Sequence, residues 1–133
     1  MDVTEFALSF INEVTKEDNE TKGAFRSRAR ELYSMAYFDG ILPTLAFIYS
    51  KAKEENVKNM LKGIQVQIKD KSYALYLVSI IRYLKEIENI KDIDGSIDSI
   101  FNKIKENEAL LSSKIFILLN WLKLFSEAKI RSD

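Results

Sequence analysis

Basic and aromatic side chains recur along residues 22–38, with a spacing that suits contact with a nucleic acid. At about 100° per residue, a helix gathers five of them on one stripe: Lys22, Arg26, Arg30, Tyr33 and Tyr37. No acidic residue lies between Lys22 and Arg30. Cations of this kind bind phosphates, and aromatic rings stack on bases. The pattern favours a phosphodiester-binding face, and its alternative is an ordinary solvated charged face with tyrosines at the edge of the core.

The sequence lacks two of the residue types that enzymes use most often in catalysis. The chain has no cysteine and no histidine, which removes thiolate nucleophiles, the commonest metal ligands and the commonest acid–base group near neutral pH. Asp92, Asp94 and Asp98 surround Gly95 as in a calcium loop, but the twelfth position is Lys103 instead of the required glutamate. Carboxylates with bound magnesium remain as the one enzymatic alternative. We expect no catalysis, no metal and no cofactor.

The charge of the chain is balanced but unevenly distributed. Formal net charge is zero, whereas a free-standing nucleic-acid binder is usually basic. Acidic residues cluster near the start, at 13–20, and again at 86–98. This segregation predicts a dipolar surface, with one side for RNA and the other for a basic partner or another copy of the chain. The alternative is ordinary mixed surface charge.

Uncharged segments are short in this chain. The longest run from 40 to 50 and from 72 to 81, well below the roughly 20 residues that span a bilayer. The start, MDVTEFALSF, lacks the charged region of a signal peptide. We therefore expect a cytoplasmic protein with no membrane partner.

The hydrophobic pattern predicts helices throughout the chain. Apolar residues recur at helical spacing over about 2–16, 22–38, 43–53, 55–69, 73–89, 97–104 and 108–128. Asp2 with Glu5 predicts a capping box, Ser72 and Ser96 predict helix N-caps, and Gly40 predicts a helix end. Residues 64–68 alternate as an exposed strand would, but a single strand has no partner, so we expect helix there. The aromatic residues of these helices are expected in the core. They are Phe6, Phe10, Phe25, Phe47, Phe101, Phe116, Trp121 and Phe125.

These elements predict an all-α fold, a compact bundle of six to seven helices. With 133 residues, of which 47% are hydrophobic, the chain has the size and apolar content for a single core. We therefore expect one helical domain, residues 1–133.

Two segments resemble a known family. RARELYSMAYFDGILPTLAFIYSKAK at 28–53, and LLNWLKLFSEA at 118–128, resemble the small helical subunit of the Cmr complex, the type III-B CRISPR effector. The order and spacing of these segments, and the total length, are similar across nearly the whole chain.

The resemblance implies a helical, non-catalytic subunit of an antiviral effector. Members of this family stack in several copies beside the backbone subunits that hold the CRISPR RNA, and they support target RNA binding. Leu124 stands where the family often has a basic residue, which moves the expected RNA contact to the second helix and Lys51. The expected contacts with the RNA backbone are Lys22, Arg26, Arg30 and Lys51, with Tyr33 or Tyr37 adjacent. The expected partners are CRISPR RNA, target RNA, other effector subunits and further copies of the chain. The alternative is a helical protein–protein adaptor with no nucleic-acid role.

Overall fold

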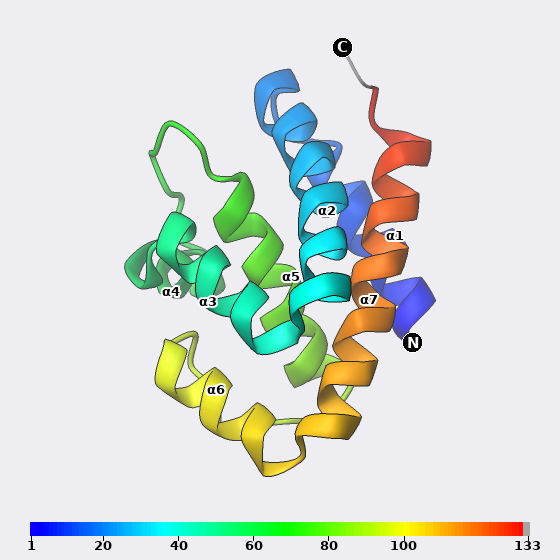
Figure 1. Ribbon diagram of the computed structural model, residues 1–133. Helices are drawn as coiled ribbons and strands as arrows, with labels where there is room; N and C mark the ends of the chain where they lie inside the picture. Colours follow the sequence, from blue (N-terminus) through cyan, green and yellow to red (C-terminus); the bar gives the residue numbers. More distant parts are fainter. Residues whose placement is uncertain (132–133) are drawn as a thin grey trace.

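Seven α-helices follow one another in the computed structural model, which describes residues 1–131 (Figure 1). They are α1 (Val3–Val14), α2 (Asn19–Asp39), α3 (Ile41–Ala52), α4 (Glu54–Leu61), α5 (Ser72–Glu86), α6 (Ile97–Glu106) and α7 (Glu108–Lys129). The described part of the chain contains no strand. The predicted all-α bundle of six to seven helices is confirmed.

Local capping explains where several helices begin. The amide of Glu5 donates to the Asp2 carboxylate at 2.9 Å, and the amide of Asp2 donates to Glu5 at 3.0 Å, which confirms the capping box. Ser96 caps α6, because its hydroxyl accepts from the Ser99 amide at 3.1 Å. The α2 helix begins three residues before the predicted start, because the carboxylate of Asp18 accepts from the Thr21 amide at 2.7 Å.

The prediction that Ser72 caps the fifth helix is wrong. Ser72 is already the first helical residue of α5, and its N-cap position is Lys71. The amide and hydroxyl of Ser72 both donate to one carboxylate oxygen of Asp70, at 2.9 and 2.6 Å. A carboxylate two residues before the helix therefore supplies the acceptor expected from the serine.

The prediction that the fourth helix continues to residue 69 is also wrong. The α4 helix ends at Leu61, where the amide of Ile64 donates to Asn59 and the amide of Gly63 donates to Met60. This pair of bonds is a Schellman motif, and its C′ residue, Gly63, has φ 79°. The alternating segment 64–68 is neither helix nor strand and connects α4 to α5.

The α5 helix runs through the middle of the bundle and packs against α2, α3 and α4 (Figure 1). It buries most of its residues, including Tyr76, Leu77 and Ile80 with no exposed surface. The predicted aromatic core is confirmed only for Phe6, Phe10 and Phe25. The other five aromatic residues predicted in the core lie at its border and are partly exposed, namely Phe47, Phe101, Phe116, Trp121 and Phe125.

The α7 helix is long and apolar enough to cross a membrane by length and composition alone. Core helices of folded domains pass the same test, and α7 packs along both α1 and α2. Its outer side still exposes Leu110, Ile117 and Leu124, at 49%, 46% and 43% of their surfaces. These three residues are spaced by seven, so they form one apolar stripe along the helix.

Candidate nucleic-acid interface

The α2 and α7 helices lie side by side and antiparallel, and this pairing builds one edge of the candidate site (Figure 1). Contacts run in opposite order along the two helices. Arg30 pairs with Glu127, Tyr33 lies under Lys123, and Tyr37 lies beside Phe116. The stripe that spacing predicted on α2 therefore meets a matching stripe on α7. We call this shared edge the α2/α7 edge.

Arg30 and Lys123 bring two cations to the α2/α7 edge. The guanidinium of Arg30 lies 3.1 Å from the Glu127 carboxylate, yet 66% of the Arg30 side chain stays exposed. The ammonium of Lys123 lies 4.8 Å from the centre of the Tyr33 ring, and that ring stacks on Phe116 at 4.9 Å. The cation–π contact and the stacking hold Tyr33 and Lys123 in place beside Arg30.

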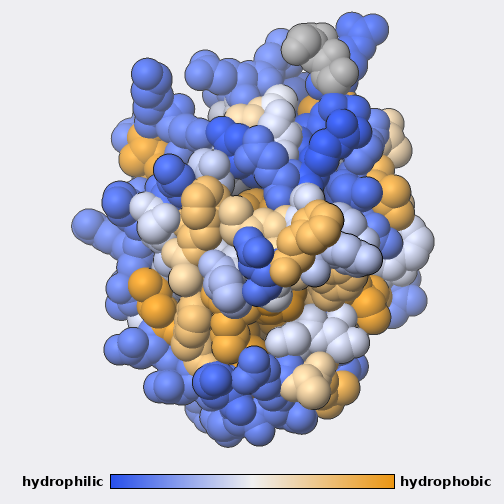
Figure 2. Space-filling model, viewed as in Figure 1, coloured by the Kyte–Doolittle hydropathy of each residue, from blue (hydrophilic) through white to orange (hydrophobic). Residues whose placement is uncertain are grey.

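A hollow of about 350 Å³ opens on the α2/α7 edge. Its lining consists of Arg30, Tyr33, Ser34, Tyr37, Phe38 and Lys123. Figure 2 shows hydrophobic residues gathered in the middle of this face of the molecule, with hydrophilic residues above and below them. Cations and aromatic rings thus line a single concave surface, which can bind an anionic ligand that also has a flat apolar face.

Lys22 and Arg26 continue the same stripe toward the start of α2, but Arg26 borders a second hollow. This hollow, of about 340 Å³, lies over the outer side of α2 and is also lined by Arg28 and Arg131. The Nε of Arg26 is buried, and within residues 1–131 it has no hydrogen-bond partner. The Nε of Arg28 is likewise buried without a partner among these residues, but its two terminal nitrogens lie within 3.6 Å of Glu31 and Asp70. Arg26 is thus the member of this pair with no acidic partner among the described residues.

Lys51 lies away from the α2 stripe. Its ammonium is 5.6 Å from the centre of the Phe47 ring, which packs edge-on against Tyr73. Tyr73 in turn carries the guanidinium of Arg28 at 4.6 Å. Arg28 points to the opposite side of α2 from Arg30, because two residues along a helix turn it by about 200°. The structure therefore gathers Arg30, Tyr33 and Tyr37 at one edge and places Lys51 near the other.

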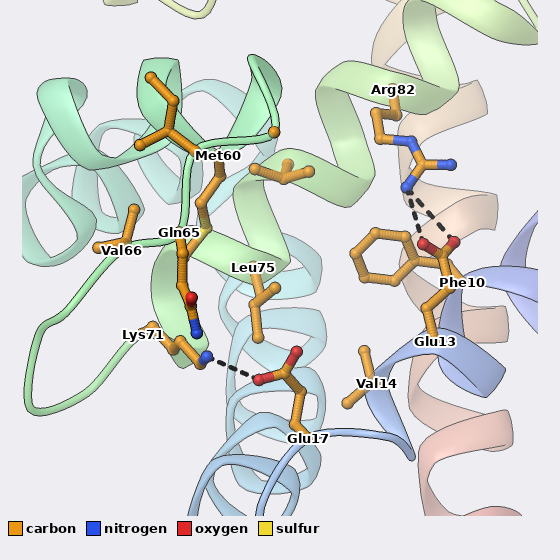
Figure 3. Close-up of a pocket in the computed structure, with 13 residues that line it drawn as sticks. Phe10, Glu13, Val14, Glu17, Met60, Gln65, Val66, Lys71, Leu75 and Arg82 are labelled. Carbon is orange, nitrogen blue, oxygen red and sulfur yellow. Dashed lines mark hydrogen bonds and ion pairs between the residues drawn. The ribbon is translucent and has the colours of Figure 1, made fainter.

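A third hollow, of about 260 Å³, lies between the end of α1, α5 and the segment 63–66 (Figure 3). Its floor is apolar, and its charges are already paired. The Lys71 ammonium is 2.7 Å from Glu17, and the Arg82 guanidinium is 3.4 Å from Glu13. Both cations of this hollow are bound to carboxylates, so it offers a phosphate less free charge than the α2/α7 edge does.

The acidic turn before α6 serves the backbone. The Asp94 carboxylate accepts from the Ser96 amide at 2.9 Å and from the Ser99 hydroxyl at 3.0 Å. These bonds, with that of the Ser96 amide the strongest, lower the pKa of Asp94 to about 2. No group of acidic residues within the described range is arranged to hold a metal ion.

Sequence reasoning missed the contribution of α7 to the α2/α7 edge. Phe116, Lys123 and Glu127 recur at intervals of seven and four, so helical spacing places them on one side of α7. That signal was present in the sequence. Their alignment with Arg30 and Tyr33 depends on how α2 and α7 pack, which spacing within one helix cannot give.

Comparisons with known proteins agree on one family. The family described as CRISPR-associated protein (Cas_Cmr5) matches residues 1–129. The CRISPR system CMR subunit Cmr5 of Saccharolobus solfataricus is 34% identical over 111 residues, which covers 76% of this chain and 68% of that relative.

Two solved structures are similar over nearly the whole chain. A chain of the type III-B Cmr-beta complex bound to cognate target RNA and AMPPnP superposes with a TM-score of 0.80 and 26% identity, covering 98% of this chain and 97% of that one. A chain of the Cmr-beta complex bound to non-cognate target RNA gives a TM-score of 0.82 and 26% identity, covering 100% and 99%. With the family match over residues 1–129, these likenesses show that the chain belongs to the CRISPR-associated Cmr5 family.

Proposed function

We propose that this chain is the non-catalytic small subunit of a cytoplasmic type III-B CRISPR effector complex. In this proposal several copies stack within the complex and contact the backbone of the guide and target RNA, which supports RNA-guided antiviral defence. The observation that carries the proposal is the similarity over nearly the full chain to subunits of Cmr-beta complexes that hold target RNA.

The α2/α7 edge supports the RNA part of the proposal. Arg30 is largely exposed, and its ion pair with Glu127 lies at the surface. Such pairs contribute only about 0–1 kcal/mol, so a phosphate competes with the carboxylate at little cost. The guanidinium also has five donors, enough to bind a phosphate while it keeps one bond to Glu127.

The remaining proposed contacts are Lys22 and Arg26 along the stripe, Tyr33 or Tyr37 beside it, and Lys51 near the other edge of α2. Because Lys51 lies apart from the stripe, we propose that it reaches a different phosphate from the one at Arg30. Each phosphate contact steepens the salt dependence of binding by roughly 0.7–0.9 in the log–log slope. A few contacts on a chain of zero net charge give weak affinity, and several stacked copies raise it through effective concentration.

Charge reversal in the assembled complex tests this proposal. The variant Arg26→Glu with Arg30→Glu removes two proposed contacts, and target RNA affinity is measured over a range of salt concentrations. We expect lower affinity and a salt slope shallower by roughly 1.4–1.8 for each copy of the chain that contacts the RNA. The matched control is Lys16→Glu with Lys85→Glu, which changes net charge equally at two exposed positions off the stripe. If the stripe variant assembles normally and binds target RNA like the control, the proposed contact is wrong.

A pure protein–protein adaptor is the second candidate. The exposed stripe of Leu110, Ile117 and Leu124 favours it, because apolar residues repeated every seven positions suit packing against another helix. An adaptor loses its place in the complex when Ile117 becomes Glu, and it keeps RNA binding unchanged when Arg26 and Arg30 are reversed. The two variants together therefore separate the candidates.

A further inference from the structure

Two neighbouring aromatic side chains at the end of α2 are unusually exposed. Tyr37 exposes 67% of its surface and Phe38 exposes 78%. Their rings contact edge to face, with centroids 5.1 Å apart. Single exposed hydrophobic residues are ordinary, whereas neighbouring exposed rings form a contiguous apolar patch of the kind that marks a binding surface.

Both aromatic residues open onto the 350 Å³ hollow of the α2/α7 edge. Inside the hollow Tyr33 is already covered, by Phe116 at 4.9 Å and by the Lys123 ammonium at 4.8 Å. Tyr37 and Phe38 are the lining rings that remain available, and the centroid of Tyr37 is 6.3 Å from that of Phe116. The volume is at the lower end of the roughly 300–1,000 Å³ range of small-molecule pockets, which suits a single base.

We infer that this hollow accepts one unpaired nucleobase of a single-stranded RNA, which stacks on Tyr37 and meets the perpendicular ring of Phe38 with its edge, while Arg30 and Lys123 meet the flanking phosphates. The inference rests on the proposed RNA contact and deepens it, since it adds stacking on a base to contact with the backbone. It also sets a preference for single strands, because the bases of a duplex already stack on their neighbours and their faces are covered.

The charges around the hollow favour RNA over an apolar protein segment. The two charged residues that line it, Arg30 and Lys123, are both cationic. Arg30 already has Glu127 as a partner, but Lys123 forms no ion pair among residues 1–131. An apolar segment would cover the Lys123 ammonium without supplying a counter-charge, which costs free energy. A phosphodiester supplies that charge on either side of a flat ring. The hydroxyl of Ser34 adds a polar group that can donate to a base edge.

Nuclear magnetic resonance of the full chain tests the inference with three probes: a short adenosine oligomer, a blunt RNA duplex and a linear polyphosphate of matched charge. We expect the adenosine oligomer to shift the ring-proton signals of Tyr37 and Phe38. The polyphosphate should perturb only signals near Arg30 and Lys123, and the duplex should leave both rings unshifted. The inference would be overturned if polyphosphate shifted the ring signals of Tyr37 and Phe38 as much as the adenosine oligomer does. It would also be overturned if the oligomer left both ring signals unshifted.

Matched variants measure the contribution of stacking. Tyr37→Ala should lower affinity for the adenosine oligomer by about 5- to 140-fold without changing the salt slope, since stacking on one base contributes about 1–3 kcal/mol. Tyr37→Phe keeps the ring and should restore the affinity. Unchanged binding by Tyr37→Ala, together with a weakened charge-reversal variant, would refute the stacking site and leave the proposed function standing. If the Tyr37→Ala chain no longer assembled into the complex but bound the adenosine oligomer with normal affinity, the hollow would be assigned to a protein partner instead.

Discussion

Tyr49 and Tyr76 are both buried, but their hydroxyl groups differ in hydrogen bonding. The Tyr49 hydroxyl donates to the carbonyl of Gly95 at 2.9 Å and so ties α3 to the turn before α6. Tyr76 has no exposed surface, and its hydroxyl has no partner among residues 1–131. Replacing each residue by phenylalanine removes one hydroxyl group, which is hydrogen-bonded in Tyr49 and has no partner among the described residues in Tyr76.

The two replacements should change stability in opposite directions. Tyr49→Phe leaves the buried carbonyl of Gly95 without its donor, which should lower the free energy of unfolding by about 1–3 kcal/mol. Tyr76→Phe removes a hydroxyl that is buried without a partner, and an unpaired hydroxyl costs about 1–3 kcal/mol in proteins. Because the small void left behind offsets part of that gain, we expect Tyr76→Phe to raise the free energy of unfolding by about 1 kcal/mol.

Urea unfolding, monitored by circular dichroism, measures both changes. An unchanged dependence of the unfolding free energy on urea concentration checks that the variants still unfold in two states. We expect a lower midpoint for Tyr49→Phe and a higher midpoint for Tyr76→Phe than for the wild-type chain. Two variants that lose stability equally would refute this expectation, because the loss would then reflect packing rather than hydrogen bonding.

Three further predictions concern the turns and one helix interior. Gly40→Ala should lower the free energy of unfolding by about 1–3 kcal/mol, because φ 96° and ψ 168° belong to glycine alone, and thermal unfolding checks this. Gly23→Ala should instead raise it by about 0.5–1 kcal/mol in the same assay, since α2 is helical there and nothing lies within 4 Å of the added methyl. The pKa of Asp94 is lowered in the fold from 3.8 to about 2, so its stabilisation is present above pH 3.8 and disappears as pH falls to 2. Acid titration should show the stability gap between wild type and Asp94→Asn closing in that window, and a gap independent of pH would contradict the assigned hydrogen bonds.

Sequence alone predicted the helices whose ends are marked by local chemistry. Asp2 with Glu5 and Ser96 cap their helices through side chains within three positions of the amides they bind. The end of α4 was missed, because the apolar residues after Gly63 fit a continued helix as well as an extended segment. Only the hydrogen bonds that close around Gly63, and the absence of a neighbouring strand within residues 1–131, decide between them.

The candidate site was predictable in one helix only. Spacing placed Arg30, Tyr33 and Tyr37 on one stripe of α2, and the structure has them on one edge. Lys123 joins them because α7 runs antiparallel to α2, and Lys51 is set apart because α3 leads away after Gly40. Both facts depend on packing between helices, for which the periodicity of a single helix carries no information.

Membership of this chain in an RNA-guided effector is tested by a tagged pull-down from the native host, with mass spectrometry of the proteins and sequencing of the RNA. We expect recovery of larger type III-B effector subunits together with CRISPR guide RNA. Recovery of unrelated proteins without RNA would contradict this membership, and the α2/α7 edge would then be an ordinary solvated face.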